Sequence, residues 1–115
     1  MTKAAEKYTV FLTAGAEQDL ESLYDYISES DCPEKAEYVL NQLEASFDSL
    51  EQFPERGGYP KELLALGIKE FRQISFKPYQ LIYRVDGRRV IVYVIVDGRR
   101  DLQSLLARRL LTAIS

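Results

Sequence analysis

The sequence contains no histidine, and Cys32 is its single cysteine among 115 residues. One cysteine cannot form an intramolecular disulfide, which is typical of chains kept in a reducing compartment. Zinc sites are built from His and Cys ligands, and the commonest general base in enzymes is histidine. The sequence therefore excludes a conventional zinc site and histidine-based catalysis, and we expect neither a metal nor a cofactor.

Long apolar runs are absent as well. The longest spans seven residues, 90–96, whereas a membrane-spanning helix needs about 20. Residues 1–10 are interrupted by charged side chains and contain no apolar stretch of signal-peptide length. We therefore expect a cytoplasmic protein that does not associate with membranes. Glycine-rich phosphate loops and the GxSxG and HExxH motifs are also missing.

Composition and length indicate one folded domain. Hydrophobic residues make up 46% and charged residues 29% of the chain, both typical of globular proteins. A chain of this length can build its own core. No internal repeat, low-complexity tract or linker divides it, so we predict a single domain over residues 1–115.

The two halves of the chain carry opposite charge. Residues 1–66 contain five Lys and Arg and fourteen Asp and Glu, a net charge of −9. Residues 67–115 contain ten basic and four acidic side chains, a net charge of +6. A division of this size favours a polar partner for the basic half. The alternative interpretation is that the helices of the first half simply carry solvated acids.

The first half predicts a strand followed by two helices. Residues 8–12 form a β-branched and aromatic run, and Thr13 suits the N-cap of a following helix. Asp31 and Glu34 resemble a capping box for a second helix that begins near Pro33 and ends before Pro54. Each helix has one apolar stripe: Ala16, Leu20, Leu23, Tyr24 and Ile27 in the first, and Ala36, Val39, Leu40, Leu43, Phe47 and Leu50 in the second.

The second half predicts three strands and a last helix. After a loop at 53–60 and a helical turn at 63–66, strands are expected at 70–76, 79–85 and 89–96. Asp86 and Gly87 suit a tight hairpin that needs positive φ. Both alternating faces of the third strand, 89/91/93/95 and 90/92/94/96, are largely apolar, which predicts a central strand covered on both sides. Asp101 suits the cap of a helix to about 111, with Leu102, Leu105, Leu106 and Leu110 on one face. The predicted class is α+β, in the order β-α-α-β-β-β(-α), with a helix hairpin packed on a small, mostly antiparallel sheet.

Basic and aromatic residues around the three strands are the candidate binding residues. Arginine holds phosphates and carboxylates through forked hydrogen bonds, and tyrosine stacks or donates a hydrogen bond. We predict that the contacts with a polar partner come from Arg72, Lys77, Tyr79, Arg84, Arg99 and Arg100. The alternative is that these arginines pair with nearby acids and that Tyr79 and Tyr83 are half-buried sheet residues. Structural roles are preferred for Cys32 and for the Arg88–Arg89 and Arg108–Arg109 pairs.

The order of elements, together with five segments, resembles the RelE/ParE superfamily of toxins from type II toxin–antitoxin systems. The segments are 13–27, 53–54, 71–76, 79–84 (YQLIYR) and 94–101 (VIVDGRRD). The resemblance covers about residues 8–111. It implies a bacterial cytoplasmic toxin, often described as a plasmid stabilisation protein, whose cognate antitoxin lays a C-terminal segment along its surface. It implies no sequence-specific DNA binding by the toxin alone.

The superfamily has two branches with different activities. RelE-like members cut mRNA inside the ribosome, and ParE-like members inhibit DNA gyrase. The nuclease pattern has an arginine after the last strand, and Arg100 matches it. The pattern's strand arginine would align near Ser75 and its C-terminal tyrosine near Leu105 or Leu106, so neither of these is matched in this chain. A 2′-hydroxyl attack needs a proton carrier as well as cations, and only the cations are evident.

We therefore predict a ParE-like gyrase inhibitor that is not an enzyme. Its net negative charge also argues against entry into an RNA-rich ribosomal site. One alternative is a ribosome-dependent mRNA endonuclease using Arg72, Lys77 and Arg100 as cations and Tyr79 or Tyr83 as proton carrier. The other is an inactive toxin-like domain that only binds antitoxin.

Overall fold

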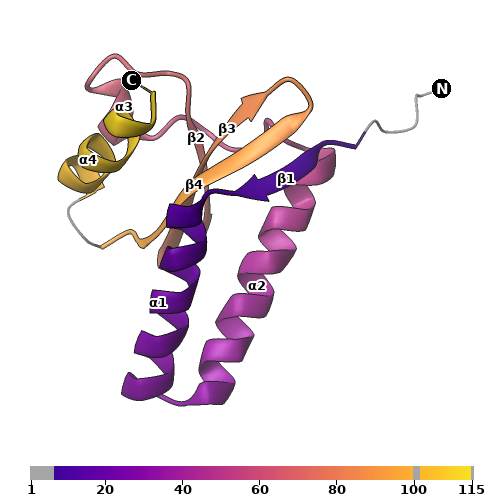
Figure 1. The fold of residues 1–115 in the computed structure, drawn as a ribbon, viewed down its shortest axis with the longest axis vertical. Coiled ribbons are helices and arrows are strands. Elements are labelled where there is room, and N and C mark those ends of the chain that lie inside the picture. Colours follow the sequence, from indigo (N-terminus) through magenta and orange to yellow (C-terminus); the bar gives the residue numbers. More distant parts are fainter. Residues whose placement is uncertain (1–6, 100–101, 115) are drawn as a thin grey trace.

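The computed structural model describes residues 7–99 and 102–114, and these form one sheet with helices on both faces (Figure 1). The elements in chain order are β1 (Thr9–Leu12), α1 (Ala14–Ser30), α2 (Pro33–Gln52), α3 (Lys61–Leu64), β2 (Arg72–Phe76), β3 (Tyr79–Asp86), β4 (Arg89–Asp97) and α4 (Leu102–Ile114). The predicted α+β class and order of elements are confirmed.

The sheet has the strand order β1-β4-β3-β2. β3 pairs antiparallel with both β2 and β4, while β1 runs parallel to β4 along the other edge. The sheet is therefore mostly antiparallel, as predicted. β4 pairs with β3 along its length and with β1 at residues 89–92, and helices cover both faces of the sheet, which explains why both of its faces are apolar.

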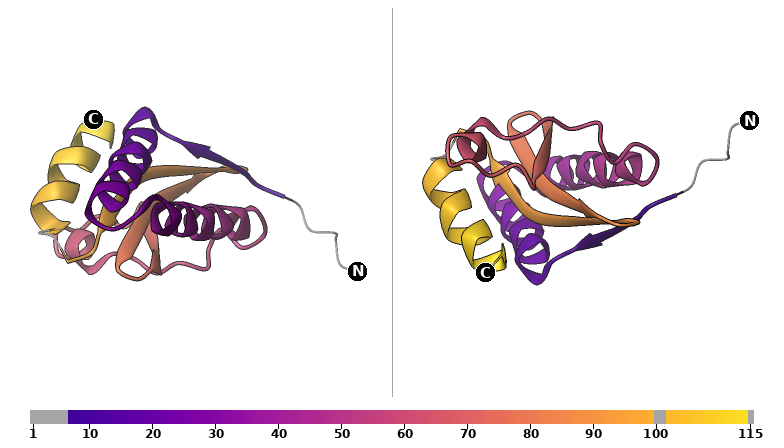
Figure 2. Two further views of the ribbon diagram at one scale, coloured as in Figure 1. Left: turned by 90° about the horizontal axis from the view of Figure 1, so that it is seen from below. Right: turned by 90° about the horizontal axis from the view of Figure 1, so that it is seen from above.

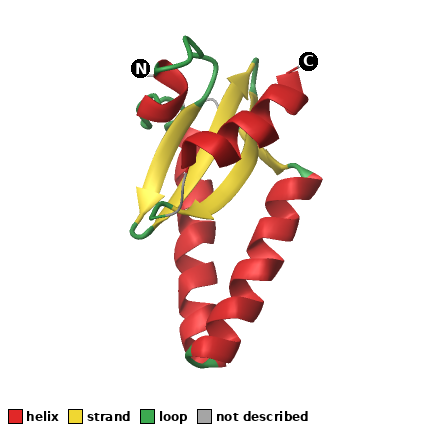
Figure 3. Ribbon diagram, turned by 90° about the vertical axis from the view of Figure 1, so that its left-hand side faces the viewer, coloured by secondary structure: helices red, strands yellow, loops and turns green. Residues whose placement is uncertain are grey.

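The α1–α2 hairpin covers one face of the sheet. The Thr13 side chain accepts a hydrogen bond from the Ala16 amide at 3.1 Å, so the predicted N-cap of α1 is confirmed. The apolar stripes of both helices pack on the sheet through residues that include Ile27, Leu43 and Leu50. The hairpin is longer than the sheet is deep, and its tip projects well beyond the strands (Figures 1 and 3).

The start of α2 differs from the prediction. α1 continues to Ser30, Asp31 is its C-cap, and Cys32 is the N-cap of α2 without a side-chain capping bond. The expected Asp31–Glu34 capping box is therefore wrong, because Asp31 is still used to end the first helix. Pro33 does occupy the first turn of α2, where its missing N–H is not needed.

The second face of the sheet is covered by α3 and α4 (Figure 3). Leu63 of α3 and Leu106 and Leu110 of α4 pack there against Phe71 and Ile82. The sheet thus separates two apolar cores, one under the hairpin and one under the C-terminal helix. The expected cap Asp101 lies outside the described residues.

A β-bulge in β4 changes which side chains share a face. Ile82 pairs with Val94 and Tyr83 pairs with Val92, so Tyr93 is the extra residue. Val92 and Ile95 consequently face the hairpin, whereas Val94 and Val96 face α4. The strict alternation assumed from the sequence is therefore wrong beyond Val92.

The β3–β4 turn also differs slightly from the expectation. Gly87 has φ +63°, and no other residue of the turn has positive φ. With strands ending at Asp86 and starting at Arg89, the loop is Gly87-Arg88, and glycine at its first position is typical of a type II′ turn. Asp86 is the last strand residue and needs no positive φ.

Within the described part of the chain, no helix is long and apolar enough to cross a membrane.

Candidate functional site

The structure divides the predicted basic set between different places. Arg72 and Arg84 lie on neighbouring strands but on opposite faces of the sheet, since Arg72 pairs with Tyr83 in the register. Lys77, Tyr79 and Arg99 lie together at the end of the sheet where the β2–β3 turn meets the end of β4. Arg100 lies outside the described residues.

Arg72 holds the loop that follows α2. Its guanidinium donates to the Gly57 carbonyl at 2.8 Å and lies 4.8 Å from the centre of the Tyr59 ring. A contact of 3.4 Å to the Glu55 carbonyl is longer than a good hydrogen bond. These contacts orient the guanidinium inwards along the loop, so Arg72 stabilises the 55–59 segment.

Arg84 packs on the aromatic residues of the α4 face. Its guanidinium carbon is 5.8 Å from the centre of the Tyr93 ring, which in turn meets Phe71 edge-on at 5.4 Å. Its Nε is buried and has no hydrogen-bond partner among residues 7–99 and 102–114. A partner carboxylate or carbonyl at this position would satisfy that donor.

Lys77, Tyr79 and Arg99 form the exposed end of the sheet. The Gly98 amide donates to the Pro78 carbonyl at 2.7 Å, which fixes the β2–β3 turn beside the residues after β4. Arg99 is 76% exposed and pairs with Asp97 at 2.5 Å, and this hydrogen bond raises the pKa of the guanidinium. Partial burial, followed by the nearby Asp97 carboxylate, raises the pKa of Tyr79. We call Lys77, Tyr79 and Arg99 the basic end.

Tyr83 is not available for chemistry. Its side chain is fully buried, and its hydroxyl donates to the Pro54 carbonyl at 2.7 Å while accepting from the Gly57 amide at 3.1 Å. Burial raises the pKa of its hydroxyl. The possible role of Tyr83 as a proton carrier is therefore excluded, because its hydroxyl is already committed and shielded from any substrate.

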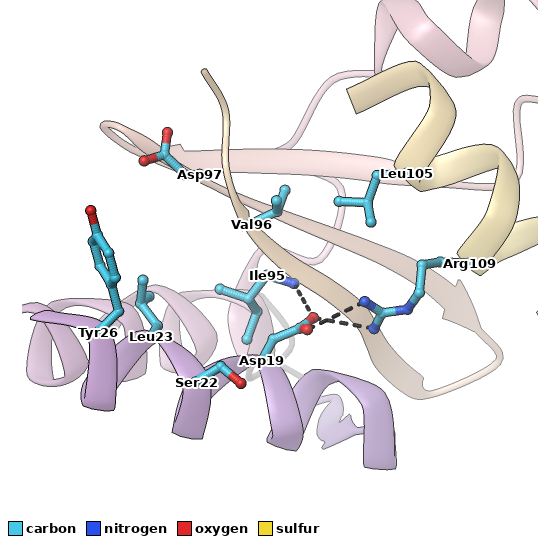
Figure 4. Close-up of a pocket in the computed structure, with 9 residues that line it drawn as sticks. All are labelled: Asp19, Ser22, Leu23, Tyr26, Ile95, Val96, Asp97, Leu105 and Arg109. Atoms are coloured by element: carbon cyan, nitrogen blue, oxygen red, sulfur yellow. Dashed lines mark hydrogen bonds and ion pairs between the residues drawn. The ribbon is translucent and has the colours of Figure 1, made fainter. Parts of the chain in front are cut away.

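The sequence did not indicate the cleft that the structure contains between α1 and α4 (Figure 4). Its volume is about 510 Å³, and β4 forms its floor. α4 lies beside α1 at this edge of the sheet (Figure 2). The cleft is lined by Asp19, Ser22, Leu23, Tyr26, Ile95, Val96, Asp97, Leu105 and Arg109.

One end of this cleft is closed by the ion pair of Asp19 with Arg109. The Arg109 Nη2 lies 3.2 Å from Asp19 Oδ2 and also donates to the Tyr93 carbonyl at 3.1 Å. Asp19 Oδ2 accepts from the Ile95 amide at 3.0 Å. The pair therefore fastens α4 to α1 and holds the edge of β4. Composition could not reveal this ion pair, because its partners are 90 residues apart in the sequence.

The chemistry of the cleft is that of a binding surface. Apolar side chains line most of it, and its two carboxylates already pair with arginines, Asp19 with Arg109 and Asp97 with Arg99. No group of three possible metal ligands occurs within residues 7–99 and 102–114. The arrangement can accept an apolar segment with hydrogen-bonding backbone.

Comparison with protein families gives a match over most of the chain. The family described as "ParE toxin of type II toxin-antitoxin system, parDE" matches residues 10–102. Toxin ParE3 of Caulobacter vibrioides is 32% identical over 100 residues, covering 87% of this chain and 96% of that protein.

Solved structures share the fold. A chain of the chromosomal ParDE toxin–antitoxin system from P. aeruginosa superposes with a TM-score of 0.67 at 22% identity, covering 81% of this chain and 98% of the other. A chain of the toxin–antitoxin complex RelBE2 from Mycobacterium tuberculosis gives a TM-score of 0.55 at 23% identity, with coverages of 84% and 97%.

Proposed function

This chain belongs to the ParE toxin family of type II toxin–antitoxin systems, and on that premise we propose that it is a cytoplasmic inhibitor of DNA gyrase that a cognate antitoxin neutralises. The observation that carries the proposal is the family match over residues 10–102, joined to 32% identity with toxin ParE3 along nearly the full length of both chains. In this proposal the toxin binds gyrase and traps its cleaved-DNA state, and needs no cofactor.

The distribution of the basic residues supports a binding role over mRNA cleavage. An in-line attack on a phosphate requires cations and a proton carrier around one phosphorus atom. Arg72 is directed into the 55–59 loop, Lys77 lies at the far end of β2, and the Tyr83 hydroxyl is buried. These groups do not converge on a shared point as a nuclease site requires.

We propose that the basic end contacts the target. Lys77 and Arg99 are exposed there, and Arg99 stays charged at any physiological pH. An exposed basic surface accelerates and orients association with an acidic partner or with DNA held by it. Arg72 and Arg84 lie towards the other end of the strands and are not part of this surface.

Gyrase supercoiling of relaxed plasmid tests the proposal. Addition of the purified, folded protein is expected to reduce supercoiled product and to increase linear, cleaved DNA, and added antitoxin should reverse both effects. Unchanged supercoiling and cleavage over a wide protein concentration would overturn the gyrase assignment. Translated mRNA would then be examined for new 3′ ends, and growth after induction without antitoxin would identify an inactive domain.

Two lysines at opposite ends of β2 provide a matched pair of variants. Lys77→Glu changes the basic end, whereas Lys69→Glu makes the same charge change before the strand begins; both side chains are exposed. We expect Lys77→Glu to weaken inhibition about tenfold, corresponding to about 1.4 kcal/mol. Lys69→Glu should remain near wild type. Equal effects of the two substitutions would indicate that only net charge matters.

A further inference from the structure

Asp97 is the last residue of β4 and lies beside the basic end. Only 24% of its side chain is exposed, and in the sheet register it pairs with Tyr79 of β3. Its carboxylate lies at the opposite end of the cleft from the Asp19–Arg109 ion pair (Figure 4). Side chains carried by paired strands are positioned more precisely than side chains on loops. Asp97 is therefore placed to hold the residues that follow β4.

Asp97 holds the backbone of Arg99 first. Asp97 Oδ1 accepts from the Arg99 amide at 2.9 Å, which is the hydrogen bond of an Asx turn. The residue between them is fixed as well, because the Gly98 amide donates to the Pro78 carbonyl at 2.7 Å. A Cβ built at Gly98 would lie 2.9 Å from the Gln80 side chain, so this segment packs closely against β3. The chain therefore leaves β4 in a defined direction.

The guanidinium of Arg99 is bound along one edge only. Its Nε donates to Asp97 Oδ1 at 2.9 Å and its Nη2 donates to Oδ2 at 2.5 Å, which makes a forked pair. The edge formed by Nη1 and Nη2 has two further parallel N–H groups. Among residues 7–99 and 102–114, none accepts a hydrogen bond from Nη1. Because 76% of the Arg99 side chain is exposed, this second edge can meet a partner.

We propose that Asp97 is a positioning residue for target binding, and that it holds Arg99 so that the second edge of the guanidinium receives a carboxylate of the target protein. The inference rests on the proposed function, because it names one contact of the surface that binds gyrase. A carboxylate matches the two parallel N–H groups of that edge. An exposed arginine normally loses rotamer freedom on binding, and Asp97 restricts that freedom beforehand, so less free energy is lost.

A protein carboxylate fits this position better than a DNA phosphate. Asp97 compensates the charge of Arg99, so the guanidinium acts mainly through the direction of its hydrogen bonds. Affinity for DNA depends instead on excess positive charge that releases counterions. The toxin has a net charge of −3, and residues 14–52 carry eleven acidic side chains and one lysine. A DNA phosphate at Arg99 is the alternative outcome of the binding experiment.

The sign of one substitution distinguishes positioning from charge. Asp97→Asn removes a negative charge, which would strengthen binding to an acidic partner if only charge mattered. It also removes the forked pair, while the amide oxygen can still accept from the Arg99 backbone. We expect Asp97→Asn to weaken binding to DNA-free gyrase about fivefold in calorimetry. Urea unfolding should show little change in stability, because ion pairs of exposed arginines contribute little.

Asp86 provides the matched control on the neighbouring strand. It pairs with Arg89 through a single hydrogen bond of 2.8 Å at the other end of the sheet, and both side chains are exposed. Asp86→Asn makes the same charge change and should leave the affinity within about twofold of wild type. Equal affinities of the Asp97→Asn and Asp86→Asn proteins would overturn the inference.

The dependence on Arg99 separates positioning from a general structural effect. In an Arg99→Ala background, Asp97→Asn should cause no further loss of affinity, because the guanidinium that it positions is absent. Nuclear magnetic resonance of the free toxin should show slower hydrogen exchange of the Arg99 Nε–H group in the wild type than in Asp97→Asn. Additive losses of affinity, or equal exchange rates in the two proteins, would contradict the positioning role.

The proposed function and the positioning inference can fail separately. If the wild-type protein neither binds nor inhibits gyrase, the proposed function fails, and the contact with gyrase fails with it. If the wild type binds and inhibits gyrase but Asp97→Asn binds at least as tightly, only the positioning inference fails. If Asp97→Asn weakens binding only when gyrase holds DNA, the partner of Arg99 is a phosphate and the carboxylate assignment is overturned.

Discussion

Tyr83 connects the loop after α2 to the centre of the sheet. It is fully buried in β3, and its hydroxyl makes one hydrogen bond as donor to Pro54 and one as acceptor from Gly57. Both partners belong to the FPERGGYP loop, and Arg72 holds the same loop through Gly57. A residue that could be considered for catalysis from its sequence position is therefore a structural anchor.

Removal of the Tyr83 hydroxyl should destabilise the fold. Tyr83→Phe leaves the buried Gly57 amide and Pro54 carbonyl without their partner, which typically costs about 1–3 kcal/mol. Urea unfolding followed by circular dichroism measures this change in the free energy of unfolding. Tyr38→Phe is the control, because Tyr38 is 53% exposed, and its cost should stay below about 0.5 kcal/mol. Equal stabilities of the two variants would contradict the anchoring role.

The same hydroxyl predicts a dependence of stability on alkaline pH. Burial raises the pKa of Tyr83 in the folded state, while unfolding returns it to about 10. Above about pH 10 the unfolded state loses this proton and the folded state retains it, so the contribution of the neutral hydroxyl falls as pH rises. The stability difference between wild type and Tyr83→Phe should therefore be smaller at about pH 11 than at about pH 8. A difference that is constant or grows would show that the hydroxyl does not stay protonated on folding.

Gly15 provides space for the Arg109 guanidinium. A Cβ built at Gly15 would lie 2.7 Å from Arg109 Nη2. Alanine in place of glycine normally stabilises a helix by up to about 1 kcal/mol. In an Arg109→Ala background, we expect Gly15→Ala to raise the free energy of unfolding by about 0.5 kcal/mol. In the wild-type background the same substitution should raise it by less or should lower it. Urea unfolding of the four proteins of this cycle measures the coupling, and an identical gain in both backgrounds would contradict it.

At the scale of elements, apolar spacing was sufficient to predict most of the fold. The stripes of α1 and α2, the N-cap Thr13 and the apolar faces of β4 each follow from local rules of helix and strand geometry. The bulge at Tyr93 does not, because it inserts a residue without any local composition signal. The Asp19–Arg109 pair is also unpredictable from spacing, since it depends on where α4 is placed.

The candidate site was predicted less well for the same reason. Lys77, Tyr79 and Arg99 lie near one another because consecutive strands bring them together. Their proximity could therefore be predicted from the order of the strands in the sequence. Arg72 and Arg84 are close in the sheet register but face opposite sides, which depends on strand phase. The cleft is formed by α1, β4 and α4, elements distant along the chain, and no motif marks it.

The second core should fix α4 in place. Leu106 is fully buried against the sheet, whereas Leu105, one residue earlier on the same helix, is only partly buried and lines the cleft. Leu106→Ala is expected to cost about 2–5 kcal/mol of unfolding free energy, and Leu105→Ala clearly less. Urea unfolding gives both values. Equal costs would mean that α4 contributes little to the stability of the sheet.

At the scale of the whole molecule, opposite charges are separated along its length. The hairpin, residues 14–52, carries eleven acidic side chains and one lysine, and it projects from the sheet along the longest dimension of 46 Å (Figure 1). Glu17, Glu21, Asp25 and Glu29 follow one another at four-residue spacing on α1, and all are exposed. The excess of basic residues lies in the sheet and α4, at the other end of the molecule.

This charge separation predicts salt-sensitive self-association of the toxin without its antitoxin. The acidic hairpin of one molecule should attract the basic sheet of another in 10 mM salt, where the screening length is about 30 Å. The attraction should be much weaker in 150 mM salt, because the screening length is then about 8 Å. Light scattering over this range should detect net attraction that disappears as salt is added. Glu21→Lys combined with Asp25→Lys should abolish it, because both side chains are exposed on the hairpin. If the exposed apolar residues Tyr26 and Phe53 cause the association instead, it will persist in the double variant and strengthen with sulfate, since burial of apolar surface is favoured by excluded salts.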